Sequence, residues 1–419
     1  MESFLKFLYQ SPTAHFAVKN LSETLIDSEF ILLKEGSPWE LSEGKSYLVT
    51  RGQTALIAFT IPQKYNSFHF IGAHTDSPNL RLRHAPSQKN ENYHQHPVEV
   101  YGGVLLHTWI DRDLAIAGTL TVNKGGTLTP VLVNINTPMF KIPSLAIHLH
   151  RDVNEKGLHL NKHQHFNAIS GLIDVEEKEV QSLVGYIAET YGYSLDDIKG
   201  FDLSFYDYQK PSVIGIQNEF ISSPRLDNLA MCYAGIEALK KADVKNSISV
   251  VALFDHEEVG SESYTGAAGS FLEDTLHRIC SALSISDFYE MKSRSFFISA
   301  DMAHAIHPNY KEKHDGLEFP LINKGPVFKY NANERYATNS ETEAYLNLLA
   351  EEAGVKIQRF TNRQDLACGS TIGPAISTRI GVPTIDIGNP MLSMHSIREL
   401  CGVQDMQEIE RLFIAFFQK

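Results

Sequence analysis

The chain has 419 residues, 43% of them hydrophobic and 21% charged, a balance typical of a soluble globular protein with about two or three domains. Its formal net charge of −13 argues against a nucleic-acid-binding protein and against a polybasic membrane-surface protein, because both need clustered Lys and Arg. Four cysteines without a CxxC spacing exclude a disulfide framework and a cysteine-based zinc module, and they favour the cytoplasm. The first residues are not typical of a signal peptide, and no apolar run approaches the roughly 20 residues of a membrane span.

The first candidate site residues follow the apolar segment 67–73 (SFHFIGA), which is typical of a buried strand. His74 and Asp76 come directly after it. Residues i and i+2 of an extended segment lie on one face, so Asp76 can accept a hydrogen bond from the imidazole nitrogen of His74 that does not bind a metal. An exposed histidine beside an aspartate is the alternative.

An inserted domain is predicted at residues 87–213, where Asn, His, Gly and Thr become frequent and the predicted strands are short. Because the motifs before and after it complement one another, residues 1–86 and 214–419 are expected to form one discontinuous catalytic domain. A separate metal site in the insert is one interpretation of its clustered histidines. Solvated hairpin residues are the alternative, favoured by the lack of carboxylates or cysteines in fixed register. The histidines are His148, His150, His159, His163 and His165.

Three carboxylates follow in the next segments. Asp227 begins a predicted helix of sequence LDNLAMCYAGIEALKK, where the helix dipole favours a carboxylate, so a simple N-cap is the alternative to a ligand. The uncharged strand 247–254 (SISVVALF) leads into Glu257 and Glu258. Adjacent residues of an extended chain point opposite ways, so one glutamate can hold a metal while the other transfers a proton. A solvated loop at the edge of a sheet is the alternative, although buried carboxylates are costly unless they meet a metal, a partner or a substrate.

Two later strands also lead to candidate ligands. The strand of sequence SFFISA runs into Asp301, and the strand of sequence VPTIDIG leads towards His395. Ser396 and Glu399 have the spacing of a capping box, which predicts that His395 lies at the start of the last helical region.

Outside the insert, strands alternate with helices, which predicts a three-layer α/β domain with a largely parallel sheet. Sites in such sheets form beyond the carboxyl ends of the strands. Two histidines and three carboxylates arrive there, a set that suits two zinc ions sharing one carboxylate and would also fit cobalt or manganese. Glu257 would then take a proton from water and give it to the leaving amine, in a metal-assisted hydrolysis of an amide. The candidate ligands are His74, Asp227, Glu258, Asp301 and His395.

The motifs HTDSP, SPRLDN, DHEEVGS, SADMAHA, KGPV, GSTIGP and MHSIRE together resemble the aspartyl-aminopeptidase family of dinuclear zinc exopeptidases, over essentially the whole chain. The resemblance implies Glu257 as the general base, Asp76 as the residue that orients His74, and a cis peptide bond between Asp227 and Asn228. It also implies two ligand sets with Asp227 shared: His74, Asp227 and Asp301 for one zinc, and Asp227, Glu258 and His395 for the other.

The resemblance further implies that the β-rich insert mediates dimerisation, that dimers assemble into a tetrahedral dodecamer, and that His148 reaches the active site of a neighbouring subunit. Lys329, in the strand KGPVFKY, matches a lysine that would select an acidic residue at the amino terminus of the substrate. A solvated strand residue is the alternative for Lys329. The predicted function is thus a cytoplasmic zinc aminopeptidase with N-terminal Asp or Glu as candidate substrates. The alternatives are a non-catalytic oligomeric metal-binding scaffold and a deacylase-type metallohydrolase.

Overall fold

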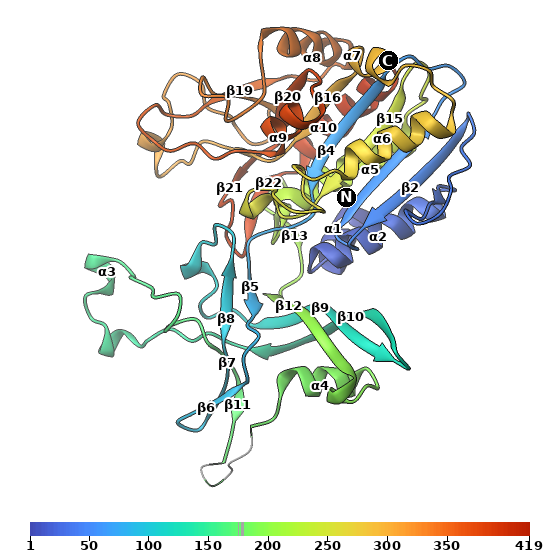
Figure 1. The fold of residues 1–419 in the computed structure, drawn as a ribbon. Helices are drawn as coiled ribbons and strands as arrows, with labels where there is room; N and C mark the ends of the chain where they lie inside the picture. Colours follow the sequence, from blue (N-terminus) through green and yellow to red (C-terminus); the bar gives the residue numbers. More distant parts are fainter. Residues whose placement is uncertain (175, 177–179) are drawn as a thin grey trace. The chain divides into compact units, whose positions relative to one another are not determined.

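The computed structural model describes residues 1–174, 176 and 180–419, which divide into two compact units (Figure 1). We call them the main unit (Met1–Ser77, Pro211–Met394 and Glu399–Lys419) and the insert unit (Pro78–Lys210 and His395–Arg398). These limits differ from the predicted insert at residues 87–213. The difference arises because β5 (Asn79–Leu82) pairs with β12 (Ile198–Asp207) in the insert unit, whereas β13 (Ser212–Ile214) pairs with β14 (Phe220–Ser223) in the main unit.

The main unit is built on a nine-stranded sheet with the strand order β1-β2-β3-β15-β4-β16-β20-β18-β19. The four central strands, β15, β4, β16 and β20, run parallel, so their carboxyl ends lie at one edge of the sheet. The strands span Ile31–Leu32 (β1), Lys45–Arg51 (β2), Ala55–Ile61 (β3), Ile248–Phe254 (β15), Phe68–His74 (β4), Phe296–Ala300 (β16), Thr384–Gly388 (β20), Val327–Tyr330 (β18) and Gln358–Thr361 (β19).

Every residue of the four central strands is buried, because helices cover both faces of the sheet. Alternate side chains of β4 enter two separate cores: Ile71 and Ala73 pack on one face, and Phe68 and Phe70 on the other. This arrangement confirms the predicted three-layer α/β fold. The first core contains α1 (Glu2–Gln10), α2 (Ala14–Asp27), α5 (Leu226–Lys241), α8 (Ser340–Ala353) and α10 (Val403–Phe417), and the second contains α6 (Phe271–Ala282), α7 (Phe288–Ser293) and α9 (Ile372–Ile380).

A second sheet of the main unit corrects one local prediction. It has the order β13-β14-β22-β21-β17, in which β22 spans Glu399–Gly402, β21 spans Pro390–Leu392 and β17 spans Ala303–His304. The predicted capping box is wrong, because Glu399 begins a strand and the last helix starts only at Val403. Pairing of β22 with β14 on one side and β21 on the other overrides the local helix signal.

The insert unit is rich in strands and has its own apolar core. One sheet has the order β10-β9-β12-β5-β8, and a smaller one has the order β11-β7-β6. Its other elements are β6 (Gln88–Asn90), β7 (Tyr93–His96), β8 (Val98–Tyr101), β9 (Leu114–Lys124), β10 (Thr127–Phe140), α3 (Val153–Lys156), β11 (Ala168–Leu172) and α4 (Leu183–Thr190). In the part of the chain that is described, no helix combines the length and the apolar character that crossing a membrane requires.

A buried carboxylate ties three elements of the main unit together. Asp386 of β20 is fully buried and accepts hydrogen bonds from the hydroxyls of Ser299 (2.6 Å) and Thr371 (2.5 Å) and from the N–H of Ala337 (2.6 Å). Burial raises the pKa of Asp386, although these hydrogen bonds oppose the shift. The carboxylate thereby joins β16, the start of α9 and the loop that precedes α8.

We expect Ser299→Ala to lower the free energy of unfolding by about 1.5–3 kcal/mol, because it removes a buried donor to a carboxyl group. Ser249→Ala is the matched control: Ser249 is also fully buried in the sheet, and its hydroxyl has no hydrogen-bond partner among the described residues. That control should change stability by less than about 0.5 kcal/mol. Chemical denaturation measures both, and equal losses would show that the Asp386 network contributes nothing specific.

Candidate metal centre

The parallel strands bring the candidate side chains to one edge of the main sheet. His74 is the last residue of β4 and pairs with Phe254, the last residue of β15. Glu257 and Glu258 follow β15 in a short 3-10 turn, and Asp301 directly follows β16. Asp227 lies in the first turn of α5 with non-helical dihedral angles, and Arg225, not Asp227, is the N-cap of that helix.

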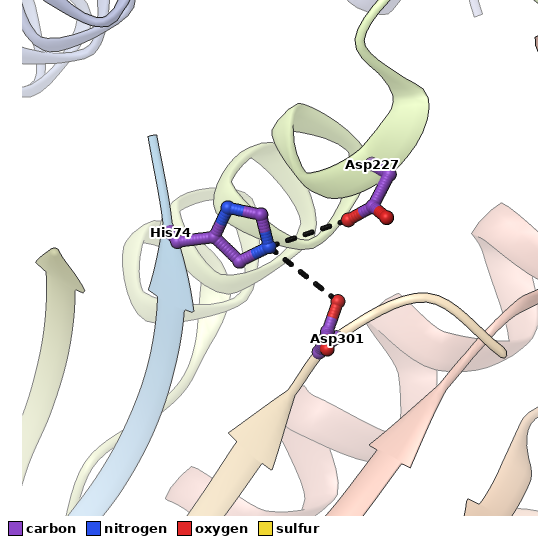
Figure 2. Close-up of side chains that lie close together, drawn as sticks. All are labelled: His74, Asp227 and Asp301. Carbon is purple, nitrogen blue, oxygen red and sulfur yellow. Dashed lines mark ion pairs between the residues drawn. The ribbon is translucent and has the colours of Figure 1, made fainter. Parts of the chain in front are cut away.

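Three carboxylates lie close to the Nε2 atom of His74, and Figure 2 shows two of them, those of Asp227 and Asp301. Nε2 lies 3.3 Å from Oδ1 of Asp227, 3.5 Å from Oδ1 of Asp301 and 3.9 Å from Oε2 of Glu257. The side chain of His74 is only 1% exposed and that of Glu257 only 14% exposed, so the alternatives of an exposed histidine and a fully solvated glutamate loop are wrong. The site is therefore an anionic cluster around one imidazole.

The other ring nitrogen determines the tautomer of His74. Nδ1 lies 3.1 Å from the main-chain carbonyl oxygen of Asp76, which can only accept a hydrogen bond, so Nδ1 carries the proton. The lone pair of the neutral ring is then on Nε2, which faces the carboxylates. The Asp76 carboxylate is 3.4 Å from Nδ1 and accepts the N–H groups of Glu257 (3.1 Å) and Glu258 (3.2 Å). Asp76 therefore joins His74 to the turn that carries both glutamates.

The charges in this cluster strongly favour a cation. Burial lowers the pKa of His74, but the carboxylates of Asp227, Asp301 and Asp76 outweigh it and hold the pKa well above its ordinary value. Burial raises the pKa of Glu257 to about 9; Asp301, Glu258 and Asp227 add to the rise, and His74 opposes it. Both shifts favour the protonated form of the side chain, and protonation reduces the excess of buried negative charge.

The donor atoms fit a metal such as zinc. In the main unit, His74, Asp227 and Asp301 form one group, and His74, Glu257 and Glu258 form another, in which each residue offers a ligand atom within 4.8 Å of the others. Imidazole nitrogen and carboxylate oxygen are ordinary zinc ligands. Residues drawn from four separate segments thus present a metal-binding set.

Lys329 forms an ion pair with Asp301 of this cluster, and it is not the solvated strand residue of the alternative interpretation. It is 3% exposed, and its Nζ lies 3.3 Å from Oδ2 of Asp301 and 5.5 Å from the centre of the Tyr336 ring. Burial, followed by Cys368 and Asp301, raises the pKa of Tyr336. Sequence reasoning missed Tyr336, which comes from a loop without a periodic pattern.

Asp227 is held by polar groups that the sequence did not identify. Its N–H donates to Oε2 of Glu399 at 3.0 Å, and its carbonyl accepts the hydroxyl of Ser77 at 2.7 Å. The next residue, Asn228, donates its amide to the carbonyl of Ala300 at 2.8 Å. The Asp227–Asn228 peptide bond is cis, as the resemblance implied. The main chain around Asp227 is therefore fixed from both sides.

Two predicted site residues belong to the insert unit. His395 lies in the segment His395–Arg398, and its Nδ1 is 3.1 Å from the carbonyl oxygen of Gly103. His148 is exposed in a 3-10 turn, Ile147–Leu149. Among the described residues, no metal-type group includes any member of the insert's histidine cluster, which favours the solvated alternative. That cluster is His148, His150, His159, His163 and His165.

Comparison with known proteins assigns the chain to a family. Residues 7–417 match the family described as Aminopeptidase I zinc metalloprotease (M18). The chain is 42% identical over 424 residues to a "Probable M18 family aminopeptidase 2" of Clostridium acetobutylicum, covering 99% of this chain and 98% of the relative. It is 41% identical over 465 residues to an "Aspartyl aminopeptidase" of Dictyostelium discoideum, covering 100% and 96%.

A solved structure, the "S. cerevesiae mApe1 dodecamer", matches with a TM-score of 0.86 and 30% identity, covering 100% of this chain and 96% of that chain. The fold, the length of the match and the zinc-type ligands agree with one another. The chain therefore belongs to the M18 family of zinc metalloproteases and is an aminopeptidase, a hydrolase that removes the amino-terminal residue from peptides.

Proposed function

We propose that this aminopeptidase holds two zinc ions and prefers peptides with an amino-terminal Asp or Glu. His74, Asp227 and Asp301 would bind the first ion. The second would be bound by Asp227, Glu258 and His395, so that Asp227 is shared. The observation that carries the proposal is the convergence of buried carboxylates on Nε2 of His74, with Asp227 at 3.3 Å and Asp301 at 3.5 Å. Cobalt or manganese would suit the same ligands.

Zinc, when bound, would polarise the substrate carbonyl and lower the pKa of water. Glu257 is the proposed general base, which takes a proton from the attacking water and returns it to the leaving amine. Burial raises the pKa of Glu257 to about 9. Neighbouring divalent cations lower the pKa of a carboxylic acid, which would bring Glu257 into the range where it can both accept and donate a proton. Asp76 is the positioning residue, because it holds the N–H groups of Glu257 and Glu258.

Lys329 is the residue that we propose binds an acidic side chain at the amino terminus of the substrate. A buried ammonium group can form a desolvated ion pair, which discriminates strongly against neutral side chains. The name of the Dictyostelium relative, an aspartyl aminopeptidase, supports this preference. However, Nζ of Lys329 lies 3.3 Å from Asp301, so support of that proposed ligand is a second role for the same residue.

We further infer that the chain assembles into a tetrahedral dodecamer built from dimers, in which the insert mediates dimerisation. The solved mApe1 structure is a dodecamer. In the insert, His148 is flanked by Leu145, Ile147 and Leu149, which are 61%, 47% and 74% exposed, and exposed apolar stretches of this kind are typical of contact surfaces. His148 would then reach the active site of a neighbouring subunit. The cytoplasmic location stays a prediction from the sequence.

Glu257→Gln is expected to lower kcat by about 10²–10⁴-fold while leaving the zinc content unchanged, because it removes the base and not a ligand. Turnover of an aspartyl peptide and elemental analysis of the purified protein provide the two measurements. Glu262→Gln, at an exposed glutamate of the same loop, is the control and should keep full activity. A fully active Glu257→Gln protein, or one that loses zinc, would contradict the assigned role.

The wild-type enzyme should cleave aspartyl peptides faster than leucyl peptides and should not cleave N-acetylated aspartyl peptides. Lys329→Met should reduce the aspartyl-to-leucyl ratio of kcat/KM by ~tenfold or more, because the ion pair to the substrate is lost. Lys324→Met, at an exposed lysine just before the same strand, is the control. Equal loss on both substrates would mean that Lys329 only supports Asp301. Cleavage of the N-acetylated peptide would favour the deacylase-type alternative.

The mass in solution tests the proposed assembly. Light scattering or mass photometry should give twelve times the subunit mass of 47.0 kDa. We expect the insert to contact other subunits in such a particle, because a contact there would cover the exposed Leu145, Ile147 and Leu149. A monomer at micromolar concentration would exclude the dodecamer.

A further inference from the structure

The proposed ligand His395 is carried by a segment that the insert unit holds. His395–Arg398 connects β21 to β22, and both of these strands belong to the main unit. We propose that Gly103, Thr108, Arg112 and Asp207 of the insert position His395 for the second zinc ion. This inference rests on the proposed function, in which His395 binds that ion.

The main chain of the segment is fixed on both sides of the imidazole. The carbonyl of His395 accepts the N–H of Leu105 at 3.1 Å. Two residues later, the N–H of Ile397 donates to the hydroxyl of Thr108 at 3.0 Å. The side chain of Ile397 is 4% exposed and is part of the apolar core of the insert. These contacts define where the Cα atom of His395 lies within the insert unit.

Ion pairs to the buried Asp207 carboxylate hold Arg398, the last residue of the segment. The guanidinium of Arg398 is 13% exposed and lies 3.4 Å from Oδ2 of Asp207, whose side chain is 2% exposed. Arg398 also donates to the carbonyls of Gln209 at 2.8 Å and Lys210 at 3.1 Å, and Arg112 holds the same Asp207 oxygen at 2.8 Å. A half-buried arginine with this many partners has one defined geometry, and removing a partner leaves its charge less well compensated.

The ring of His395 is oriented by the same unit. Its Nδ1 lies 3.1 Å from the carbonyl oxygen of Gly103, which can only accept, so Nδ1 carries the proton and Nε2 is the nitrogen suited to a metal. His74 has the same arrangement, with the carbonyl of Asp76 as the acceptor. A Cβ atom at position 103 would lie 3.1 Å from Nδ1, which is too tight for an ordinary contact, so glycine permits this approach. Such partners of a ligating histidine typically change metal affinity 10–100-fold.

The strands that flank the segment pair with each other within the main unit. Met391 pairs with Cys401, and Leu392 pairs with Leu400, so the β21–β22 hairpin holds both ends within the main unit. The first proposed zinc set, His74, Asp227 and Asp301, lies wholly in the main unit. Loosening the insert contacts should therefore weaken the second zinc ion and leave the first one in place.

The test uses the full-length protein, stripped of metal with a chelator and titrated with zinc against a chromophoric competitor. Thr108→Val removes the hydroxyl that accepts the Ile397 N–H, and we expect it to weaken the second zinc ~10–100-fold without changing the first. Thr108→Ser keeps the hydroxyl and should restore wild-type affinity. Arg398→Met should act like Thr108→Val. Arg81→Met is its control, because Arg81 pairs with Asp202 elsewhere in the insert. Thermal melting checks that each variant is folded.

Loss of the second zinc in Thr108→Val with rescue by Thr108→Ser supports the inference. Two unchanged zinc affinities in Thr108→Val and Arg398→Met overturn it, while the dinuclear centre itself stands. A wild-type protein that takes up only one zinc overturns the dinuclear centre and this inference with it. Equal weakening of both ions shows a general loss of structure and overturns the specific link to His395.

Discussion

Several carboxylates lie around one imidazole in the interior of the main unit. The repulsion between their negative charges determines which groups the site can bind. Asp227, Asp301 and Glu257 all approach Nε2 of His74 within 3.9 Å. Buried anions that have lost their water are tolerated only beside positive charge. The raised pKa values of His74 and Glu257 show that binding protons relieves the repulsion between the carboxylates. Divalent cations would relieve the same repulsion with their positive charge. The chemistry of an M18 aminopeptidase follows from the same requirement for positive charge.

The polar groups behind the carboxylates give the cluster its shape. Asp76 holds the two glutamate N–H groups, and Glu399 and Ser77 hold the main chain of Asp227. Each of these partners is buried, so its hydrogen bond cannot be exchanged for water at little cost. Donor atoms that are already oriented lose little entropy when a cation binds, which is the physical meaning of a preorganised metal site.

The proposed ligands are held in different ways within their own units. One ligand set comes entirely from strand ends and a helix start of the main unit, where a nine-stranded sheet fixes the backbone. His395, in contrast, depends on hydrogen bonds and ion pairs of the insert.

The sequence by itself determined the buried strands and the charges at their ends, and hence that His74 and Asp301 lie close together, because parallel apolar strands place their carboxyl ends at one edge. Asp227 joins them from the first turn of α5. It also carried the motifs of the family. Only the tertiary structure decided which side chains contact the candidate ligands. Glu399 has the local pattern of a helix cap, but strand pairing turned it into the acceptor for Asp227. Lys329 forms an ion pair with Asp301, and the ring of Tyr336, which lies in a loop, contacts Lys329. His395 is part of the insert unit. Local patterns record which surfaces are buried, whereas contacts between distant residues depend on register and packing, which no local pattern contains.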